Sequence, residues 1–165
     1  MPFPTGGLVY ESADYHNAVF VGADREGKPR HIHKHSTAAQ GSFKGNAPGS
    51  KPEYSFHWVG GGDTLFLFEA PIDMLSFISM HKQHWKSSSY AAACGVSDKV
   101  LWKTMESRPF IRNVCICLDN DETGQRAAQR ISKALTEKNI RNQILVPTRK
   151  DWNEDLLFLR KEDRK

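Results

Sequence analysis

The sequence is poor in cysteine and has no long apolar run. Its three cysteines, Cys94, Cys115 and Cys117, form no CxxC pair, which argues against a disulfide framework and against a zinc ribbon. No segment approaches the roughly 20 apolar residues that cross a bilayer, and the first ten residues lack the basic and apolar segments of a secretory signal. We therefore expect a cytoplasmic protein with reduced thiols and no membrane partner.

The charge of the sequence does little to distinguish between possible functions. The 165 residues include 23 basic and 19 acidic side chains, so the net charge is +4. This balance permits a polyanionic partner without requiring one. The length fits one domain of ordinary size with a small appendage.

Residues 24–54 contain few aliphatic side chains and are rich in Gly, Pro, Ser, Lys, Arg and His, as is typical of hairpins and loops over a thin core. Short strands are predicted at residues 17–22, 30–34 and 54–58. His31, His33 and His35 alternate, so they share one face of a strand. That spacing is awkward for a single tetrahedral ion, and it favours a strand over a zinc site.

After residue 60 the pattern changes to strands alternating with helices. Residues 64–68 form a continuous apolar run, typical of a strand that is buried on both faces, and Pro71 suits the first turn of a helix. Further elements are predicted at residues 90–93, 98–106, 111–118, 123–138 and 142–146. We expect an α/β fold with a mostly parallel sheet flanked by helices (residues 60–165), preceded by a small β-rich, loop-rich subdomain (residues 1–59).

Acidic residues follow the predicted strands. Glu69 follows residues 64–68, Asp119 and Asp121 follow the next long apolar strand, Asp151 comes after the last strand, and Asp73 lies one turn into the first helix. Any one of them alone is commonly a helix cap. Because ligands gather beyond the carboxyl ends of parallel strands, the whole set predicts a shared crevice that holds Mg²⁺ or Mn²⁺ for phosphoryl transfer.

Three segments carry a family resemblance. Residues 69–73 (EAPID) resemble the glutamate motif EGxxD, residues 119–124 (DNDETG) are similar to DxDxxG, and residues 150–154 (KDWNE) resemble the KDxN/DE element. Together they resemble the Toprim domain of DnaG-type primases, topoisomerases and certain nucleases, a Rossmann-like fold. The detail is most similar to Toprim proteins of bacterial conjugative and other mobile elements, in which a small domain of unassigned function comes first. The first part of this chain resembles the end of that small domain, so we expect the chain to be part of a longer protein.

The resemblance implies a role for each acid. Glu69 would be the metal-linked general acid or base, Asp119 and Asp121 the main metal ligands, and Asp73 and Asp151 ligands of an outer position. Asn153 replaces an acid that primases often carry, which implies a weaker second metal site. The implied activity is that of a DnaG-like DNA primase, a nucleotidyltransferase that uses Mg²⁺ or Mn²⁺ and nucleoside triphosphates.

The resemblance also implies contacts with single-stranded DNA or RNA. Residues predicted to provide them are basic or aromatic: Arg30, Lys34, Phe43, Lys44, Lys51 and Lys150. A solvated surface explains the same residues equally well. A helicase or relaxase of the same element is a further expected partner.

Two other functions remain open. A metal-dependent nuclease would use the same acids with water as the attacking group. A non-catalytic DNA-binding module of a conjugation or replication complex would use the metal cluster without turnover.

Overall fold

The structure, a computed structural model, describes residues 8–38, 43–95 and 97–162. A small antiparallel sheet comes first, with the order β1-β2-β3-β4. Its strands are β1 (Val9–Glu11), β2 (Ala18–Ala23), β3 (Pro29–His35) and β4 (Lys44–Asn46). The strands predicted at 17–22 and 30–34 are therefore confirmed as β2 and β3, whereas the three-residue β1 and β4 were not predicted.

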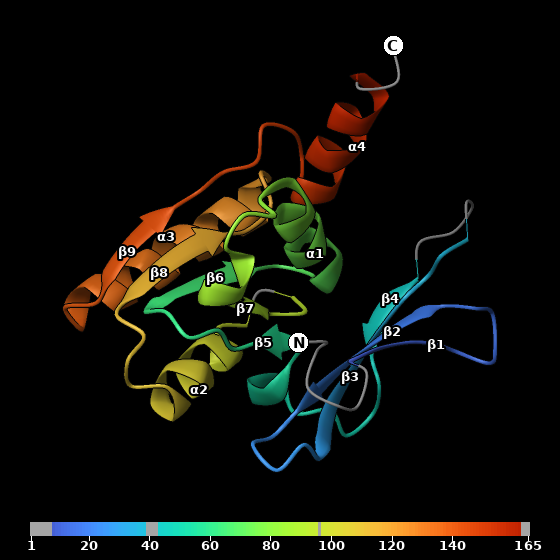
Figure 1. Cartoon of the computed structure of the whole chain (residues 1–165), viewed down its shortest axis with the longest axis horizontal. Helices are drawn as coiled ribbons and strands as arrows, with labels where there is room; N and C mark the ends of the chain where they lie inside the picture. Colours follow the sequence, from blue (N-terminus) through green and yellow to red (C-terminus); the bar gives the residue numbers. More distant parts are fainter. Residues whose placement is uncertain (1–7, 39–42, 96, 163–165) are drawn as a thin grey trace.

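A second sheet of order β5-β7-β6-β8-β9 forms the body of the molecule (Figure 1). Its strands are β5 (His57–Trp58), β6 (Thr64–Phe68), β7 (Ser89–Ala92), β8 (Asn113–Cys117) and β9 (Arg141–Ile144). The last four run parallel, and the edge strand β5 is antiparallel to β7. The mostly parallel sheet predicted from the sequence is thus confirmed.

The strand predicted at 54–58 is wrong in its first part. Residues Pro52–Tyr54 form a 3-10 turn, η1, and only His57 and Trp58 extend. Pro52 begins this turn, where its fixed φ is suitable and its missing N–H costs nothing. A second 3-10 turn, η2 (Trp85–Ser87), precedes β7.

In the described residues, four helices cover the two faces of the body sheet. They are α1 (Pro71–Met80), α2 (Lys99–Ser107), α3 (Glu122–Glu137) and α4 (Trp152–Glu162). Leu101 of α2 and Ile131 of α3 share one buried apolar cluster, and Phe77 of α1 and Trp152 of α4 share another. The sheet is therefore the middle layer of three.

The apolar run of β6 is explained by this layering. Leu65 and Leu67 point into the cluster under α2 and α3, and Phe68 points into the cluster under α1 and α4. Cys115 and Cys117 of β8 are free thiols buried in the second cluster, as small apolar side chains would be.

The small sheet packs on the body through aromatic and backbone contacts. The rings of Phe20 and Phe56 lie 5.3 Å apart between centroids, and the Ser55 hydroxyl donates to the carbonyl of Ala92 in β7 at 2.5 Å. Gly22 of β2 lies directly against the backbone of Tyr54. The division after residue 59 stays a prediction, and β5, which precedes it, already belongs to the body sheet.

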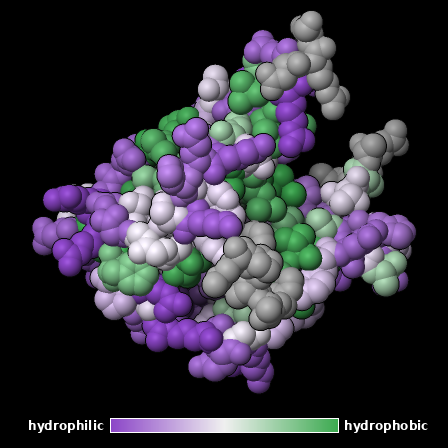
Figure 2. All heavy atoms as spheres, in the orientation of Figure 1, coloured by the Kyte–Doolittle hydropathy of each residue, from purple (hydrophilic) through white to green (hydrophobic). Residues whose placement is uncertain are grey.

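The helix α4 was not predicted, and it leaves apolar side chains exposed. Leu157 and Leu159 are exposed, and the Arg149 guanidinium lies over the ring of Phe158. Figure 2 shows apolar atoms near this helix, whereas hydrophilic side chains dominate the region over α3 and β9. Among the helices of the described ranges, none has the length and apolar character needed to cross a membrane.

Candidate active site

Two of the predicted acids leave neighbouring parallel strands at the same edge. Phe68 of β6 lies opposite Cys117 of β8. Glu69 is the first residue beyond β6, and Asp119 is the second residue beyond β8. The structure therefore places both carboxylates at the carboxyl edge of the body sheet, where the sequence predicts them.

Asp121 is the N-cap of α3. Its side chain accepts a hydrogen bond from the Gly124 N–H at 2.8 Å, which satisfies one free donor of the first helical turn. The Gln125 side chain donates to the carbonyl of Asp119 at 3.0 Å. These two bonds fix the loop between β8 and α3, and with it the position of Asp119.

Asp73 and Asp151 come from α1 and from the start of α4. Asp73 is 6% exposed and accepts a hydrogen bond from the Asn153 N–H at 3.3 Å. Asp151 accepts from the Glu154 N–H at 2.8 Å, so it caps α4 rather than ending β9, which stops at Ile144. Asp151 therefore comes after the last strand, as expected, at the start of α4.

A buried aromatic residue holds α4 against the edge that carries the acids. The Trp152 indole N–H donates to the carbonyl of Cys117 at 2.9 Å. Its ring meets the Phe77 ring edge-on, with 5.0 Å between centroids. The short loops after β8 and β9 are also joined, because the Asn120 N–H donates to the Lys150 carbonyl at 2.7 Å. Asp119 and Asp151 thus lie on loops that are bonded to each other.

Burial and the charges of neighbouring acids raise the pKa of three members of the set, Asp73, Asp119 and Glu69. Burial raises the pKa of Asp73 to about 7, and the charges of Asp151 and Glu69 add to the effect. Burial likewise raises the pKa of Asp119 to about 7, reinforced by Asp73, Glu69, Asp151 and Asp121. The pKa of Glu69 is also raised, first by burial and then by Asp121 and Asp151, against the opposing effect of Lys44 and Lys150. Burial and the neighbouring carboxylates therefore make ionisation of Asp73, Asp119 and Glu69 unfavourable.

Two oxygens of this set have no hydrogen-bond partner among the described residues. They are Glu69 Oε2 and Asp119 Oδ1, and both are buried. An unpaired buried carboxylate oxygen is costly, and a hard divalent cation is the usual partner for several such oxygens. Within the described part of the chain, no three His, Cys, Asp or Glu side chains are grouped so that they could hold a metal ion as they stand. The donor chemistry fits Mg²⁺ or Mn²⁺, which one or two carboxylates can bind together with water and phosphate oxygens.

A cavity of about 190 Å³ lies beside Glu69, between the two sheets. Lys44 and Asn46 of β4 and His33 of β3 form the wall opposite Glu69. The ring Nδ1 of His33 lies 2.8 Å from the Asn46 side-chain oxygen. His33, Asn46 and Cys94, which also lines the cavity, were not predicted to belong to the site. No sequence signal places them there, because the cavity forms only when the small sheet packs on the body.

The other predicted nucleic-acid contacts are dispersed. Arg30 forms an ion pair with Asp24 at 2.6 Å, so its charge is already engaged. Phe43 is 57% exposed and Lys51 is exposed, and no described contact joins them to the acids. Lys34 lies half-buried on β3, likewise without such a contact. Among the six, Lys44 and Lys150 lower the pKa of Glu69 through their charge.

Known protein families match both parts of the chain. Residues 66–156 match a family described as Toprim-like, and residues 3–68 match a family described as a protein of unknown function (DUF3991). An uncharacterized protein of Bacillus anthracis is 27% identical over 137 residues, which are 76% of this chain and 40% of that protein. The chain therefore spans less than half of this curated relative.

Solved structures share the fold. The primase fragment of the bacteriophage T7 primase-helicase protein is 18% identical with a TM-score of 0.66, over 94% of this chain and 63% of that chain. The DnaG primase catalytic domain bound to ssDNA is 12% identical with a TM-score of 0.60, over 95% of this chain and 54% of that one. The match to the Toprim-like family covers more than half of the sequence, and residues 66–156 contain all five acids of the candidate site. The chain therefore belongs to the Toprim-like family.

Proposed function

We propose that the edge carrying Glu69 and Asp119 is the metal-dependent phosphoryl-transfer centre of a DnaG-like primase. The observation that carries the proposal is the pair of buried, unpartnered carboxylate oxygens of these two residues at the ends of adjacent parallel strands. Asp119 and Asp121 would hold the main Mg²⁺ or Mn²⁺ ion, with Asp73 and Asp151 at an outer position. The bound ion supplies charge stabilisation to phosphate oxygens.

The protein's own residues would act on the attacking hydroxyl and on the triphosphate. The raised pKa of Glu69, caused first by burial, suits a carboxylate that accepts a proton from a sugar hydroxyl near neutral pH. The positive charges of Lys44 and Lys150 act on Glu69, lowering its pKa, and they would attract the triphosphate. The 190 Å³ cavity beside Glu69 gives the reacting groups access from the side of the small sheet.

The proposed partners follow from the structural neighbours. One of them is a primase catalytic domain bound to ssDNA, and another is the primase part of a primase-helicase protein. We therefore propose a single-stranded DNA template, nucleoside triphosphates, and a helicase or relaxase of the same replication or conjugation system. Because this chain spans only part of each of these proteins, we propose that the activity also requires other residues of the whole protein.

Metal binding is the first test. Calorimetric titration with Mn²⁺ should show binding by the unaltered chain, and a decrease in affinity of about tenfold or more after Asp119→Asn or Asp121→Asn. Asp63→Asn is the matched control, because Asp63 is exposed at the opposite, amino end of β6 and should leave the affinity unchanged. Equal affinities for all four proteins would refute the site.

Activity distinguishes the three functions. A labelled oligonucleotide is incubated with the whole protein and Mn²⁺. It becomes longer only with triphosphates if the protein is a primase, and becomes shorter without them if it is a nuclease. If the protein binds the DNA only when Mn²⁺ is present and neither lengthens nor shortens it, the protein is a binding module. The Asp119→Asn variant should abolish whichever of these is observed, because each depends on the same ion.

A further inference from the structure

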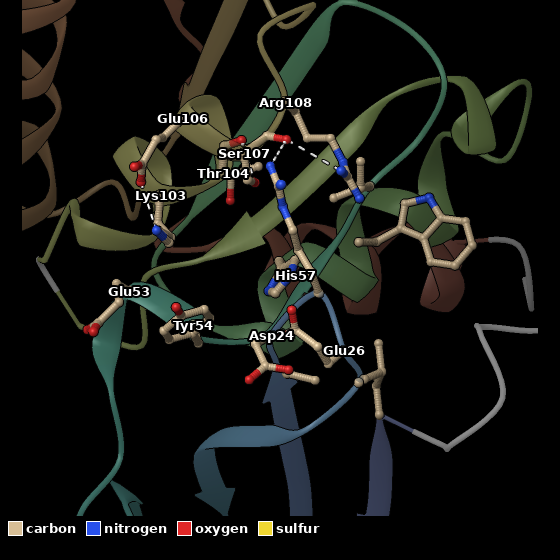
Figure 3. A pocket seen from close by; sticks show the side chains of 16 residues that line it. Asp24, Glu26, Glu53, Tyr54, His57, Lys103, Thr104, Glu106, Ser107 and Arg108 are labelled. Atoms are coloured by element: carbon tan, nitrogen blue, oxygen red, sulfur yellow. Dashed lines mark hydrogen bonds and ion pairs between the residues drawn. The ribbon is translucent and has the colours of Figure 1, made fainter.

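A second, larger cavity of about 910 Å³ lies elsewhere in the fold (Figure 3). Its walls come from the β2–β3 turn, η1, β5 and the last turn of α2. None of the five acids of the candidate active site lines it. Trp58, one of its residues, pairs with Tyr90 near the start of β7, so the cavity reaches toward the amino end of that strand rather than the acidic edge.

Two arginines from different parts of the chain converge in this cavity. Arg25 of the β2–β3 turn and Arg108 after α2 both donate to the carbonyl oxygen of Ser107 (Figure 3). One carbonyl oxygen has two lone pairs, whereas each guanidinium has five N–H donors, so most of these donors are not used by that bond. Within the ranges the structure describes, no carboxylate forms an ion pair with either arginine.

The remaining charges of the cavity are partly paired. Asp24 pairs with Arg30 at 2.6 Å, and Glu106 pairs with Lys103 at 2.8 Å. Glu26 and Glu53 line the cavity without an ion pair among the described residues. Figure 3 shows both on the side away from Arg108 and Ser107. The end near Ser107 therefore holds the two arginines beside the Lys103–Glu106 pair, and the other end offers carboxylate oxygens as hydrogen-bond acceptors.

A ligand complementary to this arrangement has an anionic group at one end and hydroxyl or amino donors at the other. An arginine guanidinium can donate two parallel hydrogen bonds to phosphate oxygens, and a carboxylate can accept hydrogen bonds from the hydroxyls of a ribose. Tyr54 and Trp58 add aromatic surface for a base. We propose that this cavity is a nucleotide-binding site, separate from the carboxylate centre, in which Arg25 and Arg108 hold the phosphates and Glu53 contacts the nucleoside. Its volume lies within the range of roughly 300–1,000 Å³ that is usual for small-ligand pockets.

The test is calorimetric titration with ATP and, separately, with inorganic pyrophosphate, in EDTA so that no divalent ion is present. ATP should bind, and Arg25→Ala or Arg108→Ala should weaken it about tenfold or more. Glu53→Gln should weaken ATP but not pyrophosphate, since only the nucleoside contacts Glu53. Arg160→Ala, an exposed arginine of α4, is the matched control and should change neither titration.

Further variants separate a binding role from a structural one. Arg25→Lys keeps a donor for the Ser107 carbonyl but loses the fork, so the melting temperature should be retained while ATP affinity falls. Asp119→Asn should not alter ATP binding in EDTA, which keeps this result independent of the proposed primase centre. Absence of ATP binding up to about 1 mM, or binding that survives both alanine substitutions, would overturn the nucleotide site.

Discussion

At the scale of single residues, Asp73 and Asp119 are acids held where their charge is unfavourable. Burial raises the pKa of both to about 7 from an ordinary value of 3.8. Between these values the folded chain binds more protons than the unfolded chain, so these groups lower stability as pH rises through the window. The loss is complete above about pH 7 in the metal-free protein.

The consequence can be measured with Asp119→Asn, which resembles the protonated acid at every pH. In EDTA, this variant should be more stable than the unaltered protein by roughly 1–3 kcal/mol at pH 8, and the difference should vanish near pH 4. Urea unfolding at several pH values gives the comparison, with exposed Asp14→Asn as the control. A difference that is the same at pH 4 and pH 8 would contradict the assigned pKa of Asp119.

The residues of the acidic edge could be predicted because strand ends and motif spacing are local properties. Glu69 and Asp119 were placed by the apolar runs that precede them. The sequence could not show which basic residues lie near the acids, because this depends on the neighbours that Arg30 and Lys44 acquire in the folded protein. Arg30 meets Asp24, whereas Lys44 comes to line the cavity beside Glu69.

At the scale of elements, long periodic segments were predictable and short ones were not. The strand β6 and the helix α1 begin where the apolar run and Pro71 predict. The strands β1 and β4 have only three residues each, and their pattern is too short to recognise. The helix α4 was missed because its exposed Leu157 and Leu159 blur the amphipathic pattern, although Trp152 anchors it firmly to β8.

The junction of β8 and α3 gives a prediction at this scale. A Cβ on Gly124 would overlap the carbonyl oxygen of Asp119, which cannot move without shifting the loop that carries the candidate ligand. Gly124→Ala should therefore weaken Mn²⁺ binding and lower stability by about 1–2 kcal/mol, because the strain exceeds the gain of about 1 kcal/mol in helix propensity. Calorimetry and urea unfolding measure the two effects.

Gly61→Ala serves as the comparison, since a Cβ there meets nothing within 4 Å. If Gly124→Ala bound Mn²⁺ as tightly as Gly61→Ala, the close approach of α3 to the Asp119 loop would have no part in the metal site.

At the scale of the whole molecule, the contact between the two sheets depends on a residue without a side chain. A Cβ on Gly22 would overlap the backbone of Tyr54 and Ser55. Gly22→Ala should destabilise the protein by about 2–4 kcal/mol, measured by urea unfolding, because backbone atoms on both sides must separate. Gly45→Ala, whose Cβ would make only an ordinary contact with Phe43, should be nearly neutral. Equal effects of the two substitutions would show that the sheets do not pack through Gly22.

The antiparallel strand β5 has a consequence for how this protein can be recombined with its relatives. Phe56 and β5 precede residue 60, yet they complete the core and the edge of the body sheet. A chimera joined at residue 60 to a foreign partner would leave β7 with an open edge, which invites aggregation. A junction placed in the turn at residues 47–50 would instead keep β5 together with the rest of the body sheet.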